Sequence, residues 1–295
     1  MGEQRQVVYT ALFGEHELLN EQPAQKESSV RFICFTDDEE LSSKTWEIHH
    51  VLPLFPADPR LSQRNIKLRG HSLLAGFHEW LYIDNTVRLK KTPESIFKEW
   101  LSGYDWAAIL QPRDSVWEEF EKNLELQKDV PERLNEQLND YSRFHASALE
   151  EVPLWNAMFA RKNNETVREV TELWFSHVCR YSSRDQLSQT VAMSSHSIRV
   201  NGIQASARLS EWHEWPHRNG ETPLSKAFRK ARPENLKHVS VLLAEANERL
   251  TTAQSRIQEL EKRQWLGLRG LWRSFQAARR RHRRLRRKRQ RLKPR

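Results

Sequence analysis

Two acidic residues about a hundred positions apart end apolar segments, where they could serve one active site. Asp84 follows the apolar run 80–83 in the segment WLYIDNTVRL, residues 80–89. A buried strand that ends in this way delivers its carboxylate to the edge of a sheet, where α/β proteins bind ligands. Asp185 follows a helix-like run in the segment LWFSHVCRYSSRDQLS, residues 173–188. Two carboxylates in one cleft, with cations nearby, suit chemistry on a phosphorylated substrate.

Four cations precede the Asp84 strand: Arg60, Arg64, Lys67 and Arg69. Arginine suits bidentate contacts with phosphate, and lysine supplies a point charge. A run of this kind is also typical of a solvated helix face. Both interpretations stay open from the residues alone.

The net charge of +9 belongs to one end of the chain. Residues 262–295 contain 16 of the 48 lysines and arginines and no acid. The rest therefore has 32 basic against 39 acidic residues, a net charge of −7. A mildly acidic body does not favour a nucleic acid as its partner.

No segment approaches the roughly 20 apolar residues that a membrane helix needs, and the N-terminal sequence lacks a signal peptide pattern. Gly2 is not followed by serine or threonine at position 6, which is Gln6, so myristoylation is not indicated. The two cysteines, Cys34 and Cys179, lie in apolar segments and are predicted to be buried free thiols. The cytosol is therefore the expected compartment.

Strands are predicted within 6–14, 29–38, 45–54, 80–83 and 105–112, and helices within 63–79, from Thr92-Pro93 onward, and within 117–127 and 132–144. Alternation of strands and helices predicts an α/β domain with a largely parallel sheet over residues 1–232. The stretch 189–232, rich in histidine and tryptophan, gives no clear assignment.

A heptad pattern marks the segment 233–262, which is the first part of a predicted long C-terminal helical extension. Apolar residues recur at spacings of three and four from Leu236 to Leu260. Two of the seam positions in one register are alanine, which weakens the seam. It could pair with a second chain as a homodimer through 236–260, or lie against the body, and the pattern favours neither.

The last segment, 263–295, is a basic amphipathic tail. Within 265–292, aromatic and leucine side chains share one helical face and arginines lie off it. This arrangement favours a helix lying on an anionic membrane surface. The alternative is a solvated arginine-rich tail that binds RNA without specificity.

Taken in order, the motifs resemble a glycosyltransferase-like family named for plant mucilage-related and turgor-regulation proteins, with bacterial relatives. The similarity covers about residues 7–190. Its pieces are VYTALFG (8–14), FICFTDD (32–38), Trp46 with Ile48, PRLSQRNIKLRGH (59–71), YIDNTVRL (82–89) with Pro93, VWEE (116–119), Gln137 with Tyr141, and the closing segment 173–188. Their order and spacing together make the match specific.

The resemblance implies a GT-A-like fold, a nucleotide-sugar-binding α/β sandwich, and a glycosyltransferase that uses a nucleotide-sugar donor. Many GT-A enzymes hold Mn²⁺ or Mg²⁺ with an Asp-x-Asp triplet, but the triplet here is Asp84-Asn85-Thr86. The resemblance therefore leaves open whether Asp84 binds a metal.

The resemblance also suggests roles for single residues. Asp84 and Asp185 are the candidate catalytic acids: Asp84 would contact ribose, sugar or metal, and Asp185 would position hydroxyls or act as general base. Turn-capping and helix-capping are the structural alternatives for the two acids. The expected donor-binding residues are Thr10, Gly14, Thr36, Asp37, Arg60, Lys67, Arg184 and Gln186.

The letters His213-Glu214-Trp215-Pro216-His217 fit the HExxH zinc motif, but that motif needs a helix, which Pro216 disfavours. A weaker expectation is that His213 or His217 returns to a metal or diphosphate, and the alternative is a plain surface histidine.

The favoured function is a cytoplasmic enzyme, peripheral on the inner face of the membrane, that glycosylates a cell-surface glycan or a lipid-linked precursor. An inactive scaffold and an RNA-binding protein are the alternatives.

Overall fold

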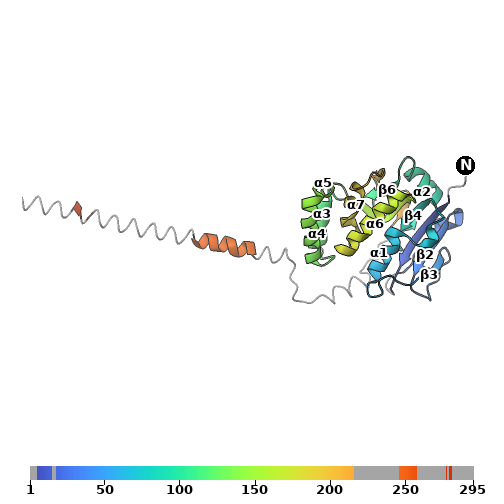
Figure 1. Cartoon of the computed structure of the whole chain (residues 1–295), viewed down its shortest axis with the longest axis horizontal. Helices are drawn as coiled ribbons and strands as arrows, with labels where there is room; N and C mark the ends of the chain where they lie inside the picture. The colour runs from blue at the N-terminus through green and yellow to red at the C-terminus, as the bar shows by residue number, and fades with distance from the viewer. Residues whose placement is uncertain (1–4, 15–17, 216–245, 258–276, 278, 281–295) are drawn as a thin grey trace, which may run out of the picture. The chain divides into compact units, whose positions relative to one another are not determined.

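The computed structural model describes residues 5–14, 18–215, 246–257, 277 and 279–280. The chain divides into two units, residues 1–236 and 237–295, and each is described by itself. Figure 1 shows the first unit as a sheet with helices packed against it.

The first unit is built on a seven-stranded sheet with the order β3-β2-β1-β4-β7-β6-β8. Six strands run in one direction and β7 runs against them, so the sheet is mostly parallel. The strands are β1 (Gln6–Leu12), β2 (Arg31–Thr36), β3 (Glu47–His50), β4 (Glu79–Ile83), β6 (Trp106–Leu110), β7 (Leu154–Lys162) and β8 (Val200–Ile203). A second small sheet pairs β5 (Arg88–Leu89) with β9 (His213–Glu214).

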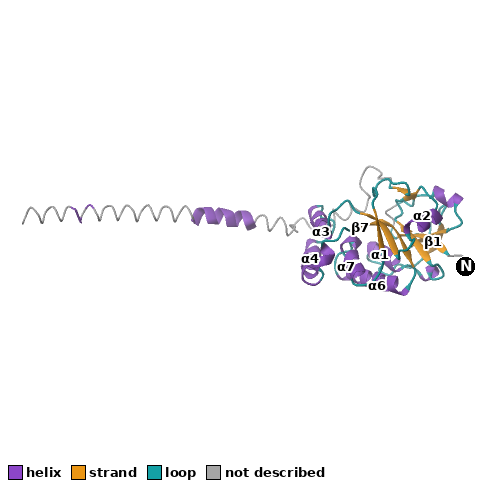
Figure 2. Ribbon diagram, turned by 90° about the horizontal axis from the view of Figure 1, so that it is seen from above, coloured by secondary structure: helices purple, strands orange, loops and turns teal. Residues whose placement is uncertain are grey.

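Helices cover both faces of the large sheet (Figure 2). Helices α1 (Pro59–Arg69) and α6 (Glu165–Arg180) pack on one face, and α2 (Pro93–Trp100) packs on the other. A third cluster of buried residues joins α3 (Val116–Glu125), α4 (Pro131–Phe144), α5 (Ala146–Leu149) and α7 (Gln189–Ser194). Short 3-10 turns lie at Pro23–Glu27, Ser72–Leu74 and Asp185–Leu187.

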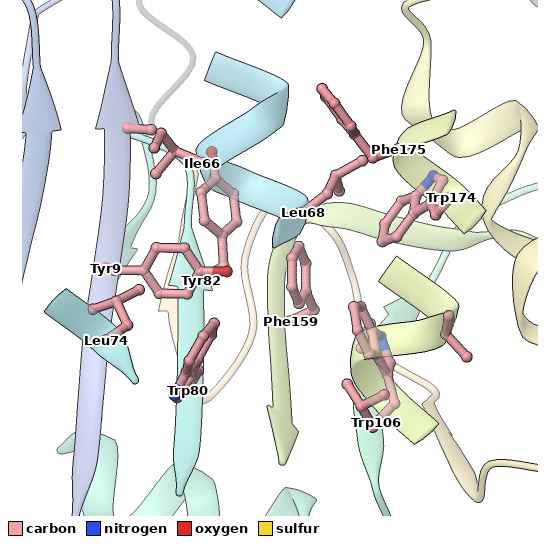
Figure 3. Packing of buried hydrophobic residues seen from close by; sticks show 14 of the residues in the cluster. Tyr9, Ile66, Leu68, Leu74, Trp80, Tyr82, Trp106, Phe159, Trp174 and Phe175 are labelled. Atoms are coloured by element: carbon pink, nitrogen blue, oxygen red, sulfur yellow. The ribbon is translucent and has the colours of Figure 1, made fainter. Parts of the chain in front are cut away.

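The central strands are apolar at almost every position because both faces of the sheet are covered. In β1, Val7 and Tyr9 face the α1 and α6 side, whereas Val8 and Leu12 face the α2 side. Figure 3 shows aromatic rings filling the space between the strands and α1 and α6, including those of Tyr9, Tyr82, Phe159 and Trp174. The core therefore holds the end of β4 and the helix α1 in fixed relation.

The predicted α/β fold with a mostly parallel sheet is confirmed. The helix expected within 63–79 begins earlier and ends at Arg69. Asp58 caps its start by accepting a hydrogen bond from the Leu61 amide at 2.9 Å. Gly70 ends it with a φ of 80°, a backbone conformation that favours glycine. Strand β7 was not predicted from the sequence, and it is the strand that runs against the rest.

One of the two cysteine predictions is wrong. Cys34 is buried in β2, and burial raises the pKa of its thiol to about 12. Cys179 is exposed, because the buried stripe of α6 runs through Trp174, Phe175 and Val178 and leaves position 179 off that face.

The described part of the second unit is short. Residues 246–257 are helical, with Leu250 57% and Ile257 56% exposed, so the pairing of the heptad seam stays a prediction. The tail segment 265–292 lies outside the described residues, apart from 277, 279 and 280, which are helical and exposed. Across the described residues, no helix combines the length and apolarity needed to cross a bilayer.

Candidate active site

Helix α1 presents three cations toward the strand ends. Arg60, Arg64 and Lys67 are spaced by four and three residues, so they lie on one face of the helix. Arg60 and Arg64 are half-buried, and the Lys67 side chain is only 2% exposed. A lysine so buried requires anionic partners.

The first partner is the carboxylate that follows β4. The Lys67 ammonium lies 3.6 Å from Oδ1 of Asp84 and 5.0 Å from the centre of the Tyr82 ring. The Tyr82 hydroxyl donates to the same Asp84 oxygen at 2.7 Å and accepts from the Gln63 amide at 2.6 Å. Burial, and then the charge of Asp84, raise the pKa of Tyr82, so this hydroxyl remains a donor.

The second partner is Asp185, which begins a 3-10 turn after α6. Its Oδ2 lies 2.7 Å from the Lys67 ammonium and 3.5 Å from Nε of Arg64. The Trp174 indole donates to the Asp185 carbonyl at 2.8 Å and fixes the backbone. The structure therefore brings Asp84 and Asp185 together on one ammonium, although they are far apart in sequence. We call Asp84, Asp185, Lys67 and Arg64 the ion cluster.

The ion cluster sets the protonation of Asp185. Burial alone would raise the pKa of this carboxyl, but the positive charges of Arg64, Lys67 and Arg184 outweigh burial and lower it to about 2. A carboxylate with so low a pKa is a weak proton acceptor. Because its side chain is also only 3% exposed, Asp185 is better suited to hold cations in place than to act as a general base.

A loop rich in serine, residues 181–186, carries Asp185, and we call it the serine loop. Asp129 anchors it, because its Oδ2 accepts from the Ser182 hydroxyl at 2.5 Å and the Ser183 amide at 3.0 Å. The Ser182 amide donates to the Gln137 side chain at 3.4 Å. Gln137 of α4, one of the positions that carry the family resemblance, therefore supports this loop.

The other cations of the site, Arg60 and Arg184, lie close enough to repel each other and Arg64. Arg60 donates to the Ser183 hydroxyl at 3.3 Å, and Arg184 donates to Asn123 and Gln186, both at 3.2 Å. Burial, and then the charges of Arg64 and Arg184, lower the pKa of Arg60. Cations held this close together are stabilised by an anion such as phosphate.

Four expected donor-binding residues lie within the first two strands or just beyond their ends. The Gly14 amide donates to Oδ1 of Asp37 at 2.9 Å, which ties these two ends together. Thr10 and Thr36 are fully buried, and the Thr36 hydroxyl accepts from the Asp38 amide at 3.1 Å. Gly14 and Asp37 are half-buried and are therefore the more accessible of the four.

Two further candidates lie apart from the ion cluster. Arg69 pairs with Glu172 at 2.8 Å on the exposed surface, so it does not join the other α1 cations. His213 lies in β9, fully buried, with its ring nitrogens 2.8 Å from the Ser210 hydroxyl and 3.0 Å from the Ala207 carbonyl. Residues 213 and 214 form a strand, whereas the zinc motif requires a helix. His217 itself lies outside the described residues.

One groove on the first unit is formed without the two acids of the site. A groove of about 590 Å³ lies beside β3 and α1 and is lined by three histidines, Asn65 and neighbouring apolar residues; the histidines are His49, His50 and His71. Neither acid of the ion cluster lines it. We place the candidate site at the ion cluster because buried charged groups with perturbed pKa values are typical of functional sites. None of the described residues that line the groove is acidic.

Sequence reasoning missed several residues of the site. Tyr82 and Gln63 orient Asp84, and Asp129 and Asn123 hold the serine loop and Arg184. The spacing of Tyr82 from Asp84, two positions along one strand face, could have indicated their contact. No local signal marks Asp129, which acts from a separate segment between α3 and α4.

Comparison with known proteins adds one finding. A model of the family described as TOD1/MUCI70, glycosyltransferase-like domain, matches residues 1–207. A search of curated proteins finds no match to the chain. The matched range contains α1, the end of β4 and the serine loop, and it confirms the resemblance that the sequence motifs indicated.

Proposed function

Because the chain belongs to the TOD1/MUCI70 glycosyltransferase-like family, we propose that it transfers a sugar from a nucleotide-sugar donor to a glycan or lipid-linked acceptor. The observation that carries the proposal is the ion cluster, in which one buried lysine joins two carboxylates beside further arginines. Glycosyl transfer needs such a site, because the leaving diphosphate must be neutralised while the sugar is held in place.

The donor would lie across the carboxyl ends of the parallel strands, where α/β sheets bind ligands. Gly14 and Asp37 would contact the base or ribose. The diphosphate would lie on Arg60, Arg64 and Arg184, because guanidinium groups bind phosphate oxygens in a bidentate fashion. Gln186 would support Arg184, to which it is already bonded.

Asp84 would touch the reacting groups. Its side chain is 27% exposed, against 3% for Asp185, so it is the carboxylate of the cluster that a hydroxyl can reach. Tyr82 and Lys67 hold the Asp84 carboxylate on one side, which leaves it oriented toward a sugar or acceptor hydroxyl. Asp185 would act as a positioning residue by fixing Lys67 and Arg64.

The C-terminal segments would bring the enzyme to its acceptor. The basic amphipathic segment 265–292 would bind an anionic membrane on its inner face, and a cell-surface glycan or lipid-linked precursor would be glycosylated there. The seam 236–260 would form a homodimer. Binding to vesicles with and without anionic lipid, by the full chain and by a chain lacking 262–295, tests the first proposal.

Turnover of a panel of nucleotide-sugars tests the proposed function. Wild-type protein should release nucleoside diphosphate from one donor, and Asp84→Asn should lower the rate by at least about 100-fold, as removal of a transition-state contact does. Glu125→Gln is the control, because Glu125 pairs with Lys122 on the exposed surface of α3. Equal rates for Asp84→Asn and the control would refute the assignment of Asp84.

A non-catalytic scaffold is the second candidate, and the triplet Asp84-Asn85-Thr86, which lacks a second acid, favours it. Tight binding of a nucleotide-sugar, seen as a raised unfolding temperature, without turnover against a broad acceptor panel would support the scaffold.

A further inference from the structure

The residues after β4 do not offer the ligand set that a divalent metal requires. The Asn85 side chain is buried and donates to the Leu18 carbonyl at 3.2 Å. The Thr86 hydroxyl accepts from the Trp215 indole at 3.0 Å. Asp84 is therefore the one side chain of the triplet with an oxygen close to the Lys67 ammonium. Among residues 5–14, 18–215 and 246–257, no three histidine, cysteine or acidic side chains gather where they could hold a metal ion.

A cation of the protein already stands between the acids. The Lys67 ammonium lies 2.7 Å from Asp185 and 3.6 Å from Asp84, where a bridging metal ion would otherwise neutralise both carboxylates. Arg64 adds a second positive charge 3.5 Å from Asp185. A divalent ion bound to Asp84 would lie close to the ammonium, and their repulsion in this buried place would be large.

We propose that the donor site works without a divalent metal, and that Lys67 and Arg64 supply the charge that a metal would supply. This inference rests on the proposed function and specifies its chemistry. Lys67 holds Asp84 and supplies a fixed positive potential from beneath the site. Arg64, Arg60 and Arg184 are half-buried and would contact the diphosphate.

The transfer step balances without an additional reactant. The bond between the sugar C1 and the diphosphate oxygen breaks, and its electron pair goes to that oxygen, where the arginines stabilise the added charge. The acceptor oxygen forms the new bond to C1 and loses its proton. Asp84 or the departing diphosphate takes this proton.

Chelation tests the proposal directly. Full-length protein is assayed with its donor in EDTA, and then with Mg²⁺ or Mn²⁺ restored. We expect the rate in EDTA to stay within about twofold of the rate with metal. Loss of more than tenfold in EDTA, recovered by Mn²⁺, would overturn the proposal.

Variants test the contributions of the Arg64 and Lys67 charges one at a time. Arg64→Gln should lower turnover roughly 100-fold, and Mn²⁺ should not rescue it. Lys67→Met leaves Asp185 without its closest partner and could prevent folding, so Lys67→Met with Asp185→Asn provides a neutral pair of similar volume. This double variant should fold and lose at least roughly 100-fold in turnover.

Lys122→Met, which changes an exposed lysine of α3, is the control. Near-normal turnover of the double variant without metal would contradict the role of Lys67.

A measurement of metal binding keeps this inference distinct from the proposed function. The electron paramagnetic resonance of Mn²⁺ is recorded with wild-type protein and with Asp84→Asn, in the presence of a nucleoside diphosphate. We expect no Mn²⁺ binding that depends on Asp84, even if the protein turns over no donor. Binding that Asp84→Asn abolishes would overturn the inference, whereas absence of turnover with every donor would count against the proposed function alone.

Discussion

Replacing Asp185 by asparagine removes the negative charge that the ion cluster is built around. The substitution keeps the size of the side chain but leaves Lys67, which is 2% exposed, with Asp84 at 3.6 Å as its remaining carboxylate. The pKa of Asp185 is about 2 in the folded protein, against 3.8 for an unperturbed aspartate. This difference corresponds to about 2 kcal/mol of folding free energy. We therefore expect Asp185→Asn to lower the free energy of unfolding at pH 7 by about 2 to 3 kcal/mol.

The lowered pKa of Asp185 predicts how the stability difference between wild type and Asp185→Asn changes with pH. Because the pKa of Asp185 is lower in the folded than in the unfolded protein, its stabilising contribution is complete above about pH 4 and is lost as pH falls through about 2. Roughly half of the contribution should remain at pH 3. The stability difference between wild type and Asp185→Asn should therefore narrow between pH 5 and pH 3.

Urea unfolding measured by tryptophan fluorescence can follow this difference, since the chain has 11 tryptophans and Trp174 bonds to Asp185 itself. Glu125→Gln, which loses an exposed ion pair, is the control and should change stability little at any pH. Equal stability of wild type and Asp185→Asn at pH 7, or a difference that widens on acidification, would refute the electrostatic account of the cluster.

Three other substitutions, and Gly103→Ala as a control for one of them, probe the elements that position the site. Gly70→Ala should destabilise the protein by about 2 to 4 kcal/mol in urea unfolding, because the new methyl group would lie 2.4 Å from the Trp80 ring at a φ of 80°. Gly103→Ala, at a φ of 82° with open space around it, should cost only about 1 kcal/mol, and equal losses would argue against the clash. Asp129→Asn should cost about 1 to 3 kcal/mol and raise hydrogen exchange in the serine loop, and unchanged exchange there would show that this anchor is unimportant. Tyr82→Phe should lower kcat about tenfold by releasing one oxygen of the neighbouring carboxylate, whereas a change in KM alone would indicate a binding role instead.

The fold could be predicted because its signals are local. Apolar strands that end in glycine or acids, and the helix that begins at Pro93, follow from backbone and burial preferences of a few neighbouring residues. Strand β7 escaped prediction because its largely apolar part, residues 154–160, also suits a buried helix segment. Its antiparallel direction depends on partners that are distant in sequence.

The site was only partly predictable for the same reason. The acids and α1 cations could be chosen by residue type and motif order, but their pairing needed the fold. From the sequence, Lys67 was expected either to bind phosphate or to lie on a solvated helix face, whereas the structure buries it between Asp84 and Asp185. The anchors of the serine loop come from α4 and from the segment before it, which nothing in residues 173–188 specifies.

A crystal structure with a bound nucleoside diphosphate sugar would test the central claim most directly. We expect the diphosphate to lie against Arg64 and Arg60, the sugar to lie beside Asp84, and Lys67 still to join Asp84 to Asp185. A donor bound in the groove lined by His49 and His71, or bound nowhere near the ion cluster, would contradict it.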